Sequence, residues 1–241
     1  MSLVSQSVTE AIILAGGMGS RLRSEVPDLP KPMAPVADRP FLEYLLDYLH
    51  GYHVSHVILS VGYKHQLILQ HFGNNYRGMK IDYAIEVEPL GTGGGLLMAV
   101  DKITGISPVV VMNGDTWFPV DLTTMAAFHQ ERNSLLTIAV HSLLNSGRYA
   151  GIEFDANKQI VNFVAQGQDG IQWINGGVYT ISPQIIKEWH SLGIKLCALE
   201  QDLIPLSIKN KAAVFAFSGD YPFIDIGIPE DYQRASSVLH N

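Results

Sequence analysis

The stretch Ile13–Val36, ILAGGMGSRLRSEVPDLPKPMAPV, joins the end of an apolar run to a loop rich in glycine, proline and basic residues. The apolar run, EAIILA (10–15), has the length and composition of a buried strand. Ligands of open α/β sheets bind beyond the carboxyl ends of the strands. The glycines that follow the run allow a tight turn and bring backbone amides close to an anion. The stretch therefore predicts a first strand that leads into an anion-binding loop.

Two cations give this loop its chemical character. Arg21 can hold a phosphate through two hydrogen bonds, and Lys31 lies between Pro30 and Pro32 on a stiffened backbone. The loop has no Gly-Lys-Ser/Thr of a P-loop, and Arg21-Leu22 occupies the place of the third glycine in the dinucleotide fingerprint. A plain turn before a proline-rich surface loop is the alternative, and the fixed cations disfavour it.

Composition and charge exclude several classes of protein. The chain of 241 residues is 47% hydrophobic and 16% charged, which is a globular composition. Its net charge of −7 argues against nucleic acid as a partner, so a phosphate site must be built locally. No run reaches the roughly 20 apolar residues of a membrane helix. The start lacks the pattern of a signal peptide, and the single Cys197 fits a reducing compartment. We expect a soluble, cytoplasmic protein without a membrane partner, and the sequence leaves a homo-oligomer open.

The order of helix and strand signals predicts an α/β fold. The two signals alternate up to about residue 130, which indicates a mainly parallel sheet with helices on both faces. Beyond that point, strand signals with short turns indicate antiparallel pairing. We expect one domain, 1–241, with a nucleotide-binding half over about 10–130 and a second-substrate half over about 131–241. The expected strands are 10–15, 56–62, 80–88, 107–115, 135–143, 150–155, 159–166, 173–181 and 212–217, and the expected helices are 41–52, 65–72, 91–103, 121–133, 183–190 and 198–209.

Four further stretches extend the motif along nearly the whole chain: EPLGTGGGL (88–96), NGDTWF (113–118), INGGVYTI (174–181) and FIDIGIPEDY (223–232). With the glycine loop and its Pro-Lys-Pro, they resemble in order the signature of the sugar nucleotidyltransferases, or nucleotide-sugar pyrophosphorylases. The segment LPKPMAPVADRPFLEYLL (29–46) looks most like the D-glycero-D-manno-heptose 1-phosphate guanylyltransferase branch. The resemblance implies a Rossmann-like three-layer sandwich around a mixed, mainly parallel sheet.

The resemblance also implies a reaction. Members of this family transfer a nucleotidyl group from a nucleoside triphosphate to a sugar 1-phosphate and release pyrophosphate. The branch favours GTP and a sugar of the heptose or mannose type, and the second half of the chain becomes the sugar-phosphate half. Arg21, Lys31 and Asp115 would be catalytic. The residues expected to bind the nucleotide are Leu14, Ala15, Gly16, Gly17, Gly19, Ser20, Arg21, Glu88, Gly93 and Asp115.

Two carboxylates are candidates for a metal site. Asp115 follows a buried apolar run, and Asp225 lies between apolar residues before a Gly-Ile-Pro turn, so each is expected at the end of a strand. One or two carboxylates with waters and phosphate oxygens form a usual magnesium site. An isolated Asp in such a place is more often a helix cap or a turn residue. The resemblance gives both Asp115 and Asp225 as metal ligands, and so Mg²⁺ as the cofactor.

The sugar side departs from the family pattern. The resemblance places Asn175 on the sugar phosphate, although a plain turn Asn fits the residue equally well. Upstream, where the family usually has Glu-Lys, this chain has Ala165-Gln166, and the glycine of the Arg-Tyr-Gly motif comes one position late. These departures leave the identity of the sugar open. The residues expected to bind the sugar phosphate are Arg148, Gly151, Asn175 and Gln166.

A glutamate is the candidate for reading the base. In an alternating strand over 80–88, Glu86 and Glu88 share a face, and Glu86 is expected to be a solvated carboxylate. Glu88 precedes the turn into the glycine-rich helix. A carboxylate offers only acceptors, which suits the two neighbouring donors of guanine better than the single donor of uracil or thymine. The residue therefore predicts GTP.

Two other functions remain open from the sequence. One is a uridylyl- or thymidylyltransferase that acts on a hexose 1-phosphate. The other is a catalytically weak, regulatory relative that binds a nucleotide sugar, which the missing Glu-Lys pair favours. The presence of Lys31, Asp115 and Asp225 together argues against the regulatory relative.

Overall fold

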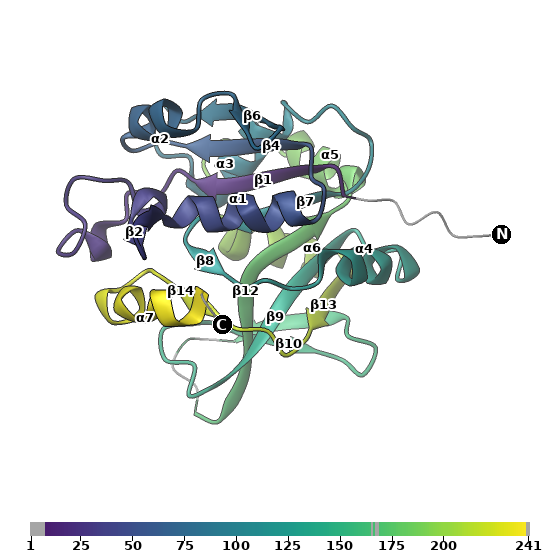
Figure 1. Ribbon diagram of the computed structural model, residues 1–241. Coiled ribbons are helices and arrows are strands. Elements are labelled where there is room, and N and C mark those ends of the chain that lie inside the picture. The colour runs from purple at the N-terminus through teal and green to yellow at the C-terminus, as the bar shows by residue number, and fades with distance from the viewer. Residues whose placement is uncertain (1–7, 165, 167–168, 240–241) are drawn as a thin grey trace.

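The computed structural model describes residues 8–164, 166 and 169–239, and only the backbone of Ser20 (Figure 1). The strands are β1 Glu10–Ala15, β2 Pro35–Val36, β3 Arg39–Pro40, β4 His56–Val61, β5 Asn75–Tyr76, β6 Met79–Ile85, β7 Val109–Asn113, β8 Thr116–Trp117, β9 Leu136–Leu144, β10 Gly151–Phe154, β11 Ile160–Val164, β12 Ile171–Ile181, β13 Val214–Ser218 and β14 Ile224–Asp225. The helices are α1 Phe41–Gly51, α2 His65–Phe72, α3 Gly91–Val100, α4 Leu122–Glu131, α5 Pro183–Ser191, α6 Ile204–Lys209 and α7 Pro229–Leu239, with short 3₁₀ turns η1 Ser20–Leu22 and η2 Lys31–Met33 and a π-helical turn η3 Leu199–Leu203.

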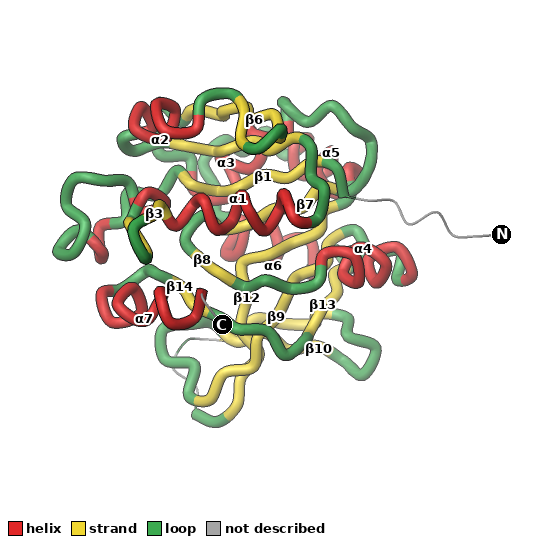
Figure 2. The backbone as a smooth tube through the Cα atoms, viewed as in Figure 1, coloured by secondary structure: helices red, strands yellow, loops and turns green. Residues whose placement is uncertain are grey.

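One large mixed sheet forms the centre of the molecule (Figure 2). Its strand order is β11-β10-β12-β7-β1-β4-β6-β5, and β9 pairs with both β12 and β13. Strands β7, β1, β4 and β6 are parallel neighbours, whereas β12 runs antiparallel to β7 and β9. The predicted fold class, a mixed and mainly parallel sheet with helices, is confirmed. One pairing differs from the expectation for the second half: β13 joins β9 in parallel, because α5, η3 and α6 return the chain to the end of the sheet where β12 ends, so that β13 starts beside the start of β9.

Helices cover both faces of the sheet because the central strands are apolar on both sides. Ala11 and Ile13 of β1 point into a buried cluster with α1 and α2, whereas Ile12 points into a second cluster with α3 and α5. Successive side chains of a strand point to opposite faces, so one apolar strand serves both clusters. Complete burial of an Ile or Leu side chain stabilises the fold by about 1.5–3 kcal/mol. The two clusters hold the carboxyl ends of the parallel strands in a fixed row.

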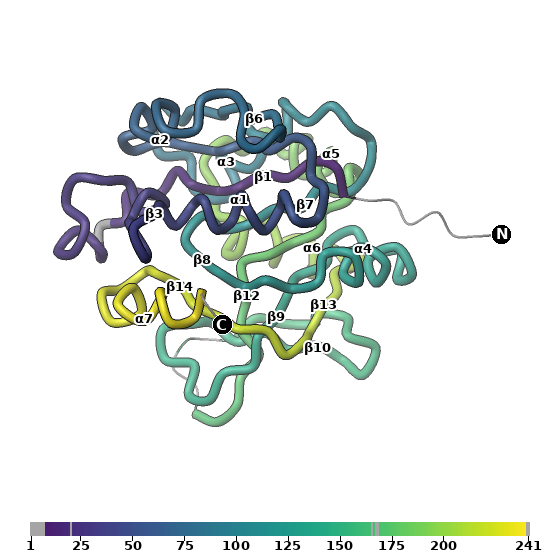
Figure 3. Tube along the Cα trace, viewed as in Figure 1, coloured from purple at the N-terminus to yellow at the C-terminus, as the bar shows by residue number. Residues whose placement is uncertain are grey.

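The end of the chain returns to this row of carboxyl ends. Strand β14 pairs antiparallel with β8, and the N–H of Ile226 donates to the carbonyl of Asp115 at 3.0 Å. Tyr232 of α7 donates its hydroxyl to the carbonyl of Pro35 at 2.5 Å. In Figure 3 the yellow α7 accordingly lies beside the purple β2–β3 segment. Segments from the two ends of the described chain therefore meet at one edge of the sheet.

Several expected elements have other boundaries in the structure, and two of these differences affect the site. The strand expected over 80–88 ends at Ile85, and the helix expected over 198–209 begins with the π-helical turn η3 before α6. Pro205 has no N–H to donate to the carbonyl one turn earlier, so the chain cannot continue a regular α-helix through this point. None of the helices among the described residues is long and apolar enough to cross a bilayer.

A buried ionic cluster joins three strands at the opposite edge of the sheet. The imidazole of His56 places Nδ1 at 2.8 Å from Glu10 Oε1 and Nε2 at 2.9 Å from Asp82 Oδ2. Both ring nitrogens can donate only in the imidazolium form. Burial raises the pKa of Glu10, but hydrogen bonds from Thr104, His56 and Gly105 outweigh it and leave this pKa below its usual value. The pKa of Asp82 is also lowered, chiefly by its hydrogen bond with Lys80.

We expect Glu10→Gln to lower the free energy of unfolding at pH 7 by about 1–3 kcal/mol, because the amide loses the charge-assisted bonds. A lowered folded-state pKa means that Glu10 stabilises the protein above its ordinary pKa of 4.5 and that this contribution is lost as the pH falls below it. Urea unfolding at a series of pH values should therefore show the deficit shrinking below pH 4.5. The exposed Glu131→Gln is the control. A deficit that stays constant with pH would contradict the assignment.

Candidate active site

The glycine loop and Lys31 fit together through one close contact. Gly19 has φ +56°, a left-handed conformation, and a β-carbon added there would lie 2.9 Å from Cβ of Lys31. Any larger residue at this position would be strained and would push against the lysine. Lys31 begins the turn η2 between Pro30 and Pro32 and is only 9% exposed. The aliphatic part of the Lys31 side chain therefore packs against the glycine loop.

The ammonium of Lys31 lies between two carboxylates. Nζ is 2.6 Å from Oδ2 of Asp115 and 3.6 Å from Oδ1 of Asp225. Asp115 follows β7, and the β8–β14 pairing brings Asp225 next to it. Oδ1 of Asp225 also accepts the N–H of Gly227 at 2.7 Å. A buried cation needs such partners, because an unpaired charge out of water is strongly disfavoured.

The guanidinium of Arg148 contacts the carboxylate of Asp225 from the side that is predicted to bind the sugar phosphate. Nη2 of Arg148 is 3.3 Å from Oδ2 of Asp225, and Nη1 is 2.7 Å from Oδ2 of Asp231. Burial lowers the pKa of Arg148, but Asp231 and Asp225 outweigh it and raise this pKa above its usual value. Asp225 therefore carries a cation on each side, Lys31 on one and Arg148 on the other.

A cavity of about 270 Å³ opens beside these groups and brings together part of the predicted nucleotide site. Of the predicted residues, Leu14, Gly16, Gly17 and Asp115 line it. Arg21 is exposed in η1 and forms no ion pair with any residue that the structure describes. The backbone of Ser20 belongs to the same turn. The other residues that line this cavity are Met18, Ser60, Glu86, Pro89, Gly91, Thr92, Gly95 and Asn113.

Glu86 is part of the cavity wall, and the expectation that it is solvated is wrong. Its carboxylate accepts the hydroxyl of Ser60 at 3.2 Å and the N–H of Leu90 at 3.0 Å. A β-carbon on Gly16 would lie 2.3 Å from Oε1 of Glu86, so this glycine makes room for the carboxylate. The alternation used for the prediction fails because β6 ends at Ile85. Glu88 is exposed and lines a neighbouring hollow.

Two of the predicted glycines serve packing in this structure. The N–H of Gly93 donates to the carbonyl of Cys197 at 2.9 Å, so it is not available to a nucleotide, which corrects that expectation. A β-carbon on Gly151 would lie 2.3 Å from Cγ2 of Val164, which explains a glycine at the start of β10. Ala15 is buried at the end of β1. Gln166 lies in an exposed bend.

A chain of hydrogen bonds joins the predicted sugar side to the nucleotide cavity. Asn175 donates to the hydroxyl of Tyr179 at 2.6 Å, and Tyr179 donates to Oε1 of Glu200 at 2.9 Å. Oε2 of Glu200 accepts the hydroxyl of Thr92 at 2.8 Å, and Thr92 lines the cavity. No pattern in the sequence points to Glu200. It lies in the π-helical turn η3, and turns of this kind occur frequently at functional sites.

The two aspartates suit a divalent cation that binds a phosphate of the substrate at the same time. Among the described residues, no group of three or more His, Cys, Asp and Glu side chains could hold a metal ion. Asp115 and Asp225 together offer two carboxylates, and the side chain of Asp115 is 38% exposed. Magnesium sites commonly combine one or two carboxylates with waters and substrate phosphates. The donor set therefore suits a hard cation that binds together with its substrate.

A match over nearly the whole chain decides the family. The family model described as nucleotidyl transferase matches residues 10–241. The chain belongs to the nucleotidyl transferase family. It is 44% identical over 232 residues to the D-glycero-alpha-D-manno-heptose 1-phosphate guanylyltransferase of Aneurinibacillus thermoaerophilus, covering 96% of this chain and 99% of that protein. A protein of the same name from Campylobacter jejuni is 38% identical over 223 residues, with 92% and 96% covered.

A solved relative carries a guanine nucleotide analogue. The crystal structure of HddC from Yersinia pseudotuberculosis complexed with GMP-PN matches with a TM-score of 0.82 and 35% identity, and the match covers 95% of this chain and 99% of that chain. The resemblance to sugar nucleotidyltransferases, and to their heptose 1-phosphate branch, is thus confirmed.

Lys31→Ala should lower kcat of this nucleotidyl transferase by about 10²–10³-fold and weaken nucleoside triphosphate binding much less. We expect this because a fixed charge acts mainly on charge that develops in the transition state. Steady-state kinetics separates the two effects, and thermal unfolding shows whether the variant is folded. Lys187→Ala, at an exposed position of α5, is the control. A change confined to KM would assign Lys31 to ground-state binding instead.

Proposed function

We propose that this chain is a guanylyltransferase that couples GTP to a sugar 1-phosphate of the heptose or mannose type. The observation that carries the proposal is the position of Lys31, held by the glycine loop between Asp225 and Asp115, of which Asp115 lines the cavity. A point charge fixed in this way suits a phosphoryl group. Two relatives that match more than nine tenths of the chain are guanylyltransferases by name.

The reaction is a direct in-line displacement. An oxygen of the sugar 1-phosphate attacks the α-phosphorus of GTP, a new P–O bond forms, and the bond to the β-phosphate breaks to release pyrophosphate. The attacking oxygen is already ionised, so no general base is needed. Arg21 and the amides of Gly16, Gly17 and Gly19 hold the β- and γ-phosphates, and Lys31 stabilises charge around the α-phosphate. Catalysis then consists of positioning and charge neutralisation.

Asp115 and Asp225 are proposed to hold Mg²⁺, which supplies positive charge to the phosphates when bound. Asp225 also aligns Lys31 and Arg148, because each cation contacts a different carboxylate oxygen of this residue. Asp115 is the more exposed of the two and faces the cavity.

Asp115→Asn and Asp225→Asn should each lower turnover by about 10²-fold or more, because each removes an anionic ligand of the cation. Titration with Mn²⁺ followed by electron paramagnetic resonance, with GTP present, gives a readout that does not depend on activity. Both variants should bind Mn²⁺ more weakly than the wild type. The control is Asp169→Asn, in an exposed bend. Normal Mn²⁺ binding in either variant would remove that residue from the metal site.

The sugar phosphate is proposed to bind on the side of Arg148, Gly151, Asn175 and Gln166. Arg148 and Asn175 carry this assignment best, because Arg148 contacts Asp225 and Asn175 belongs to the hydrogen-bonded chain. Arg148 then serves in place of the lysine that this chain lacks. Glu200 acts as a positioning residue, since it fixes Asn175 through Tyr179.

Glu200→Gln should raise KM for the sugar 1-phosphate by about tenfold and change KM for GTP by less than about twofold. Thr92 can still donate to the amide oxygen, but Tyr179 then faces an NH₂ group and one polar partner is left unpaired, at a cost of about 1–3 kcal/mol. Initial-rate kinetics with each substrate varied in turn measures the two KM values separately. Glu188→Gln on α5 is the control. Equal rises in both KM values would instead indicate a general structural role.

Glu86 takes the role in base recognition that the sequence suggested for Glu88. Its carboxylate lines the same cavity as Asp115 and keeps lone pairs beyond the two that Ser60 and Leu90 use. Guanine offers two neighbouring donors to such a group. Glu88 remains the alternative, because it lies at the rim of the hollow next to the cavity.

Pyrophosphate release over a matrix of nucleoside triphosphates and sugar 1-phosphates tests the function and the base assignment together. We expect GTP with a heptose or mannose 1-phosphate to give the highest kcat/KM. Glu86→Gln should reduce the preference for GTP over UTP and dTTP about tenfold, and Glu88→Gln should reduce it less. A preference for UTP or dTTP with a hexose 1-phosphate would make the chain a uridylyl- or thymidylyltransferase. No release with any pair would favour a regulatory relative.

Three broader expectations belong to this proposal. We infer a single domain in which about 10–130 binds the nucleotide and about 131–241 the sugar phosphate. We infer a cytoplasmic protein, which the free and buried Cys197 supports. A homo-oligomer is compatible with the proposal, and light scattering of the purified protein would measure it.

A further inference from the structure

A histidine of β9 lies among the residues that are proposed to bind the sugar phosphate. His141 pairs with Ile174 of β12, and on its other side Ile174 pairs with Gly151 of β10. Asn175 follows Ile174 along β12. Neighbouring strands lie about 4.8 Å apart, so His141 is two such spacings from Gly151. The pairing of the strands therefore brings His141 to the level of Gly151 and Asn175 in the predicted sugar-phosphate half.

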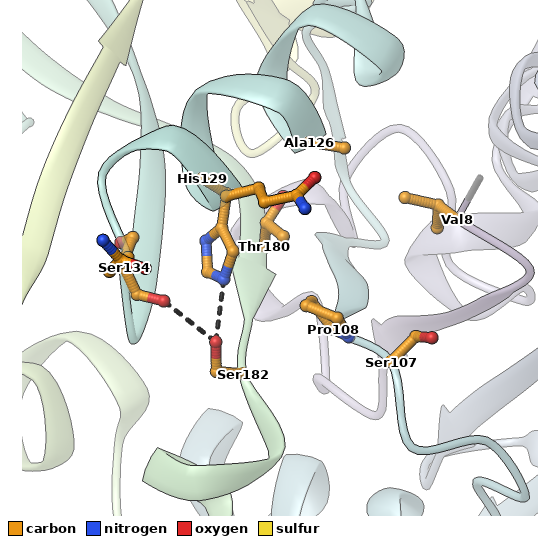
Figure 4. A pocket seen from close by; sticks show the side chains of 10 residues that line it. Val8, Ser107, Pro108, Ala126, His129, Ser134, Thr180 and Ser182 are labelled. Atoms are coloured by element: carbon orange, nitrogen blue, oxygen red, sulfur yellow. Dashed lines mark hydrogen bonds between the residues drawn. The ribbon is translucent and has the colours of Figure 1, made fainter. Parts of the chain in front are cut away.

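Both ring nitrogens of His141 are open to a ligand. They form no hydrogen bond or ion pair with any residue that the structure describes, and they are not among its buried polar atoms without a partner. His129 shows the contrast, because its imidazole bonds within the protein (Figure 4). Its Nδ1 lies 2.8 Å from Oγ1 of Thr137, and its Nε2 lies 2.8 Å from Oγ of Ser182. His129 is therefore a structural residue, whereas His141 keeps its hydrogen-bonding capacity.

Aromatic side chains fix the plane of the His141 imidazole. It stacks on Phe223, with the ring centroids 5.0 Å apart and the planes at 14°. The ring of Phe118 meets His141 edge-on, with the centroids 5.6 Å apart. Two aromatic neighbours leave the imidazole little freedom to turn, so its nitrogens keep fixed directions. A group fixed in this way can distinguish one position on a ligand from another.

The same aromatic side chains connect His141 to the groups that are proposed to hold the phosphate. Phe223 contacts the ring of Tyr149, with the centroids 5.8 Å apart. The hydroxyl of Tyr149 donates to Oδ2 of Asp225 at 3.4 Å and accepts from Nη2 of Arg148 at 2.6 Å. A pyranose ring is about the size of a phenyl ring. A sugar with its phosphate at Arg148 can therefore extend along Phe223 to His141.

The imidazole of His141 suits an uncharged part of the substrate. Burial lowers the pKa of His141, and the negative charge of Asp220 opposes this shift only in part. The ring is therefore neutral at physiological pH, with one N–H donor and one acceptor nitrogen. A hydroxyl group also donates and accepts, so the two groups are complementary. Positive charge for the phosphate comes from Arg148 instead.

We propose that His141 is a specificity-determining residue that forms a hydrogen bond with a hydroxyl group of the sugar, on the side of the sugar ring remote from the phosphate. The sugar ring then lies beside Phe223. This inference rests on the proposed function, from which it takes the substrate. A site that holds a hydroxyl group through such a bond rejects the analogue that lacks it, because the imidazole then loses its partner.

Steady-state kinetics with monodeoxy sugar 1-phosphates tests the inference. The parent compound is D-glycero-D-manno-heptose 1-phosphate or mannose 1-phosphate, whichever the wild type turns over faster with GTP. His141→Phe keeps a flat ring on Phe223 but removes both nitrogens. It should lower kcat/KM for the parent about three- to tenfold, which is the loss of one neutral hydrogen bond. The analogue that lacks the contacted hydroxyl group should show the same kcat/KM with both enzymes.

Matched controls accompany this comparison. The 2-deoxy analogue should stay as sensitive to His141→Phe as the parent, because C2 is next to the carbon that carries the phosphate. His141→Gln retains a donor and an acceptor and should restore part of the loss. His50→Phe, at an exposed position of α1, should change nothing. Thermal unfolding shows whether each variant is folded, and His141→Leu gives the same comparison if His141→Phe is not.

Three results would overturn the inference alone. An unchanged kcat/KM for the parent would mean that His141 does not contact the sugar. An equal loss with every analogue would make His141 a structural residue. A loss that disappears only with the 2-deoxy analogue would place His141 at the phosphate end of the sugar. No turnover of any sugar 1-phosphate by the wild type would instead overturn the proposed function, and the inference with it.

Discussion

The contact of the Lys31 ammonium with Asp115 and Asp225 is the interaction on which the rest of the site depends. It requires a glycine at position 19, because Cβ of Lys31 packs where another side chain would be. It also requires the β8–β14 pairing, because only this pairing brings the two aspartates together. If only part of this set of contacts formed, a buried ammonium or carboxylate would be left unpaired, at a cost of several kcal/mol. The loop, the lysine and the end of the chain are thus coupled in one arrangement.

Carboxylates that contact two partners also connect this cluster to the predicted sugar-phosphate side. Asp225 divides its two oxygens between Lys31 and Arg148, and Asp231 holds the other end of the guanidinium. Glu200 divides its oxygens between Tyr179 and Thr92. Asp225 and Glu200 therefore each join the predicted nucleotide half to the predicted sugar-phosphate half. A chain without the usual Glu-Lys pair thus has a fixed cation, Arg148, at Asp225 and a fixed carboxylate, Glu200, that is joined to Asn175 through Tyr179.

The sequence predicts the fold and the loop well because their signals are local. The apolar run before Gly16 and the Pro-Lys-Pro around Lys31 can each be recognised within a few residues. Glu86 and Glu200 could not be found in this way. The two-residue alternation of a strand says nothing about Glu86, because β6 ends at Ile85. Glu200 lies in a π-helical turn, which has no hydrophobic period of its own. The pairing of Arg148 with Asp231 joins residues far apart in sequence, and no local pattern specifies it.

The β8–β14 pairing also determines when the contacts of Lys31 can be completed during synthesis and folding. The chain is made from its amino end, and Asp115 and Lys31 leave the ribosome well before Asp225. Until β14 arrives, β8 is a short unpaired strand, and Lys31 has one carboxylate partner instead of two. Contacts between distant segments form late in folding, because the intervening chain must be ordered first. A nascent chain can therefore build its sheet and glycine loop before Lys31 has both carboxylate partners, and this cluster becomes complete only when β14 pairs with β8.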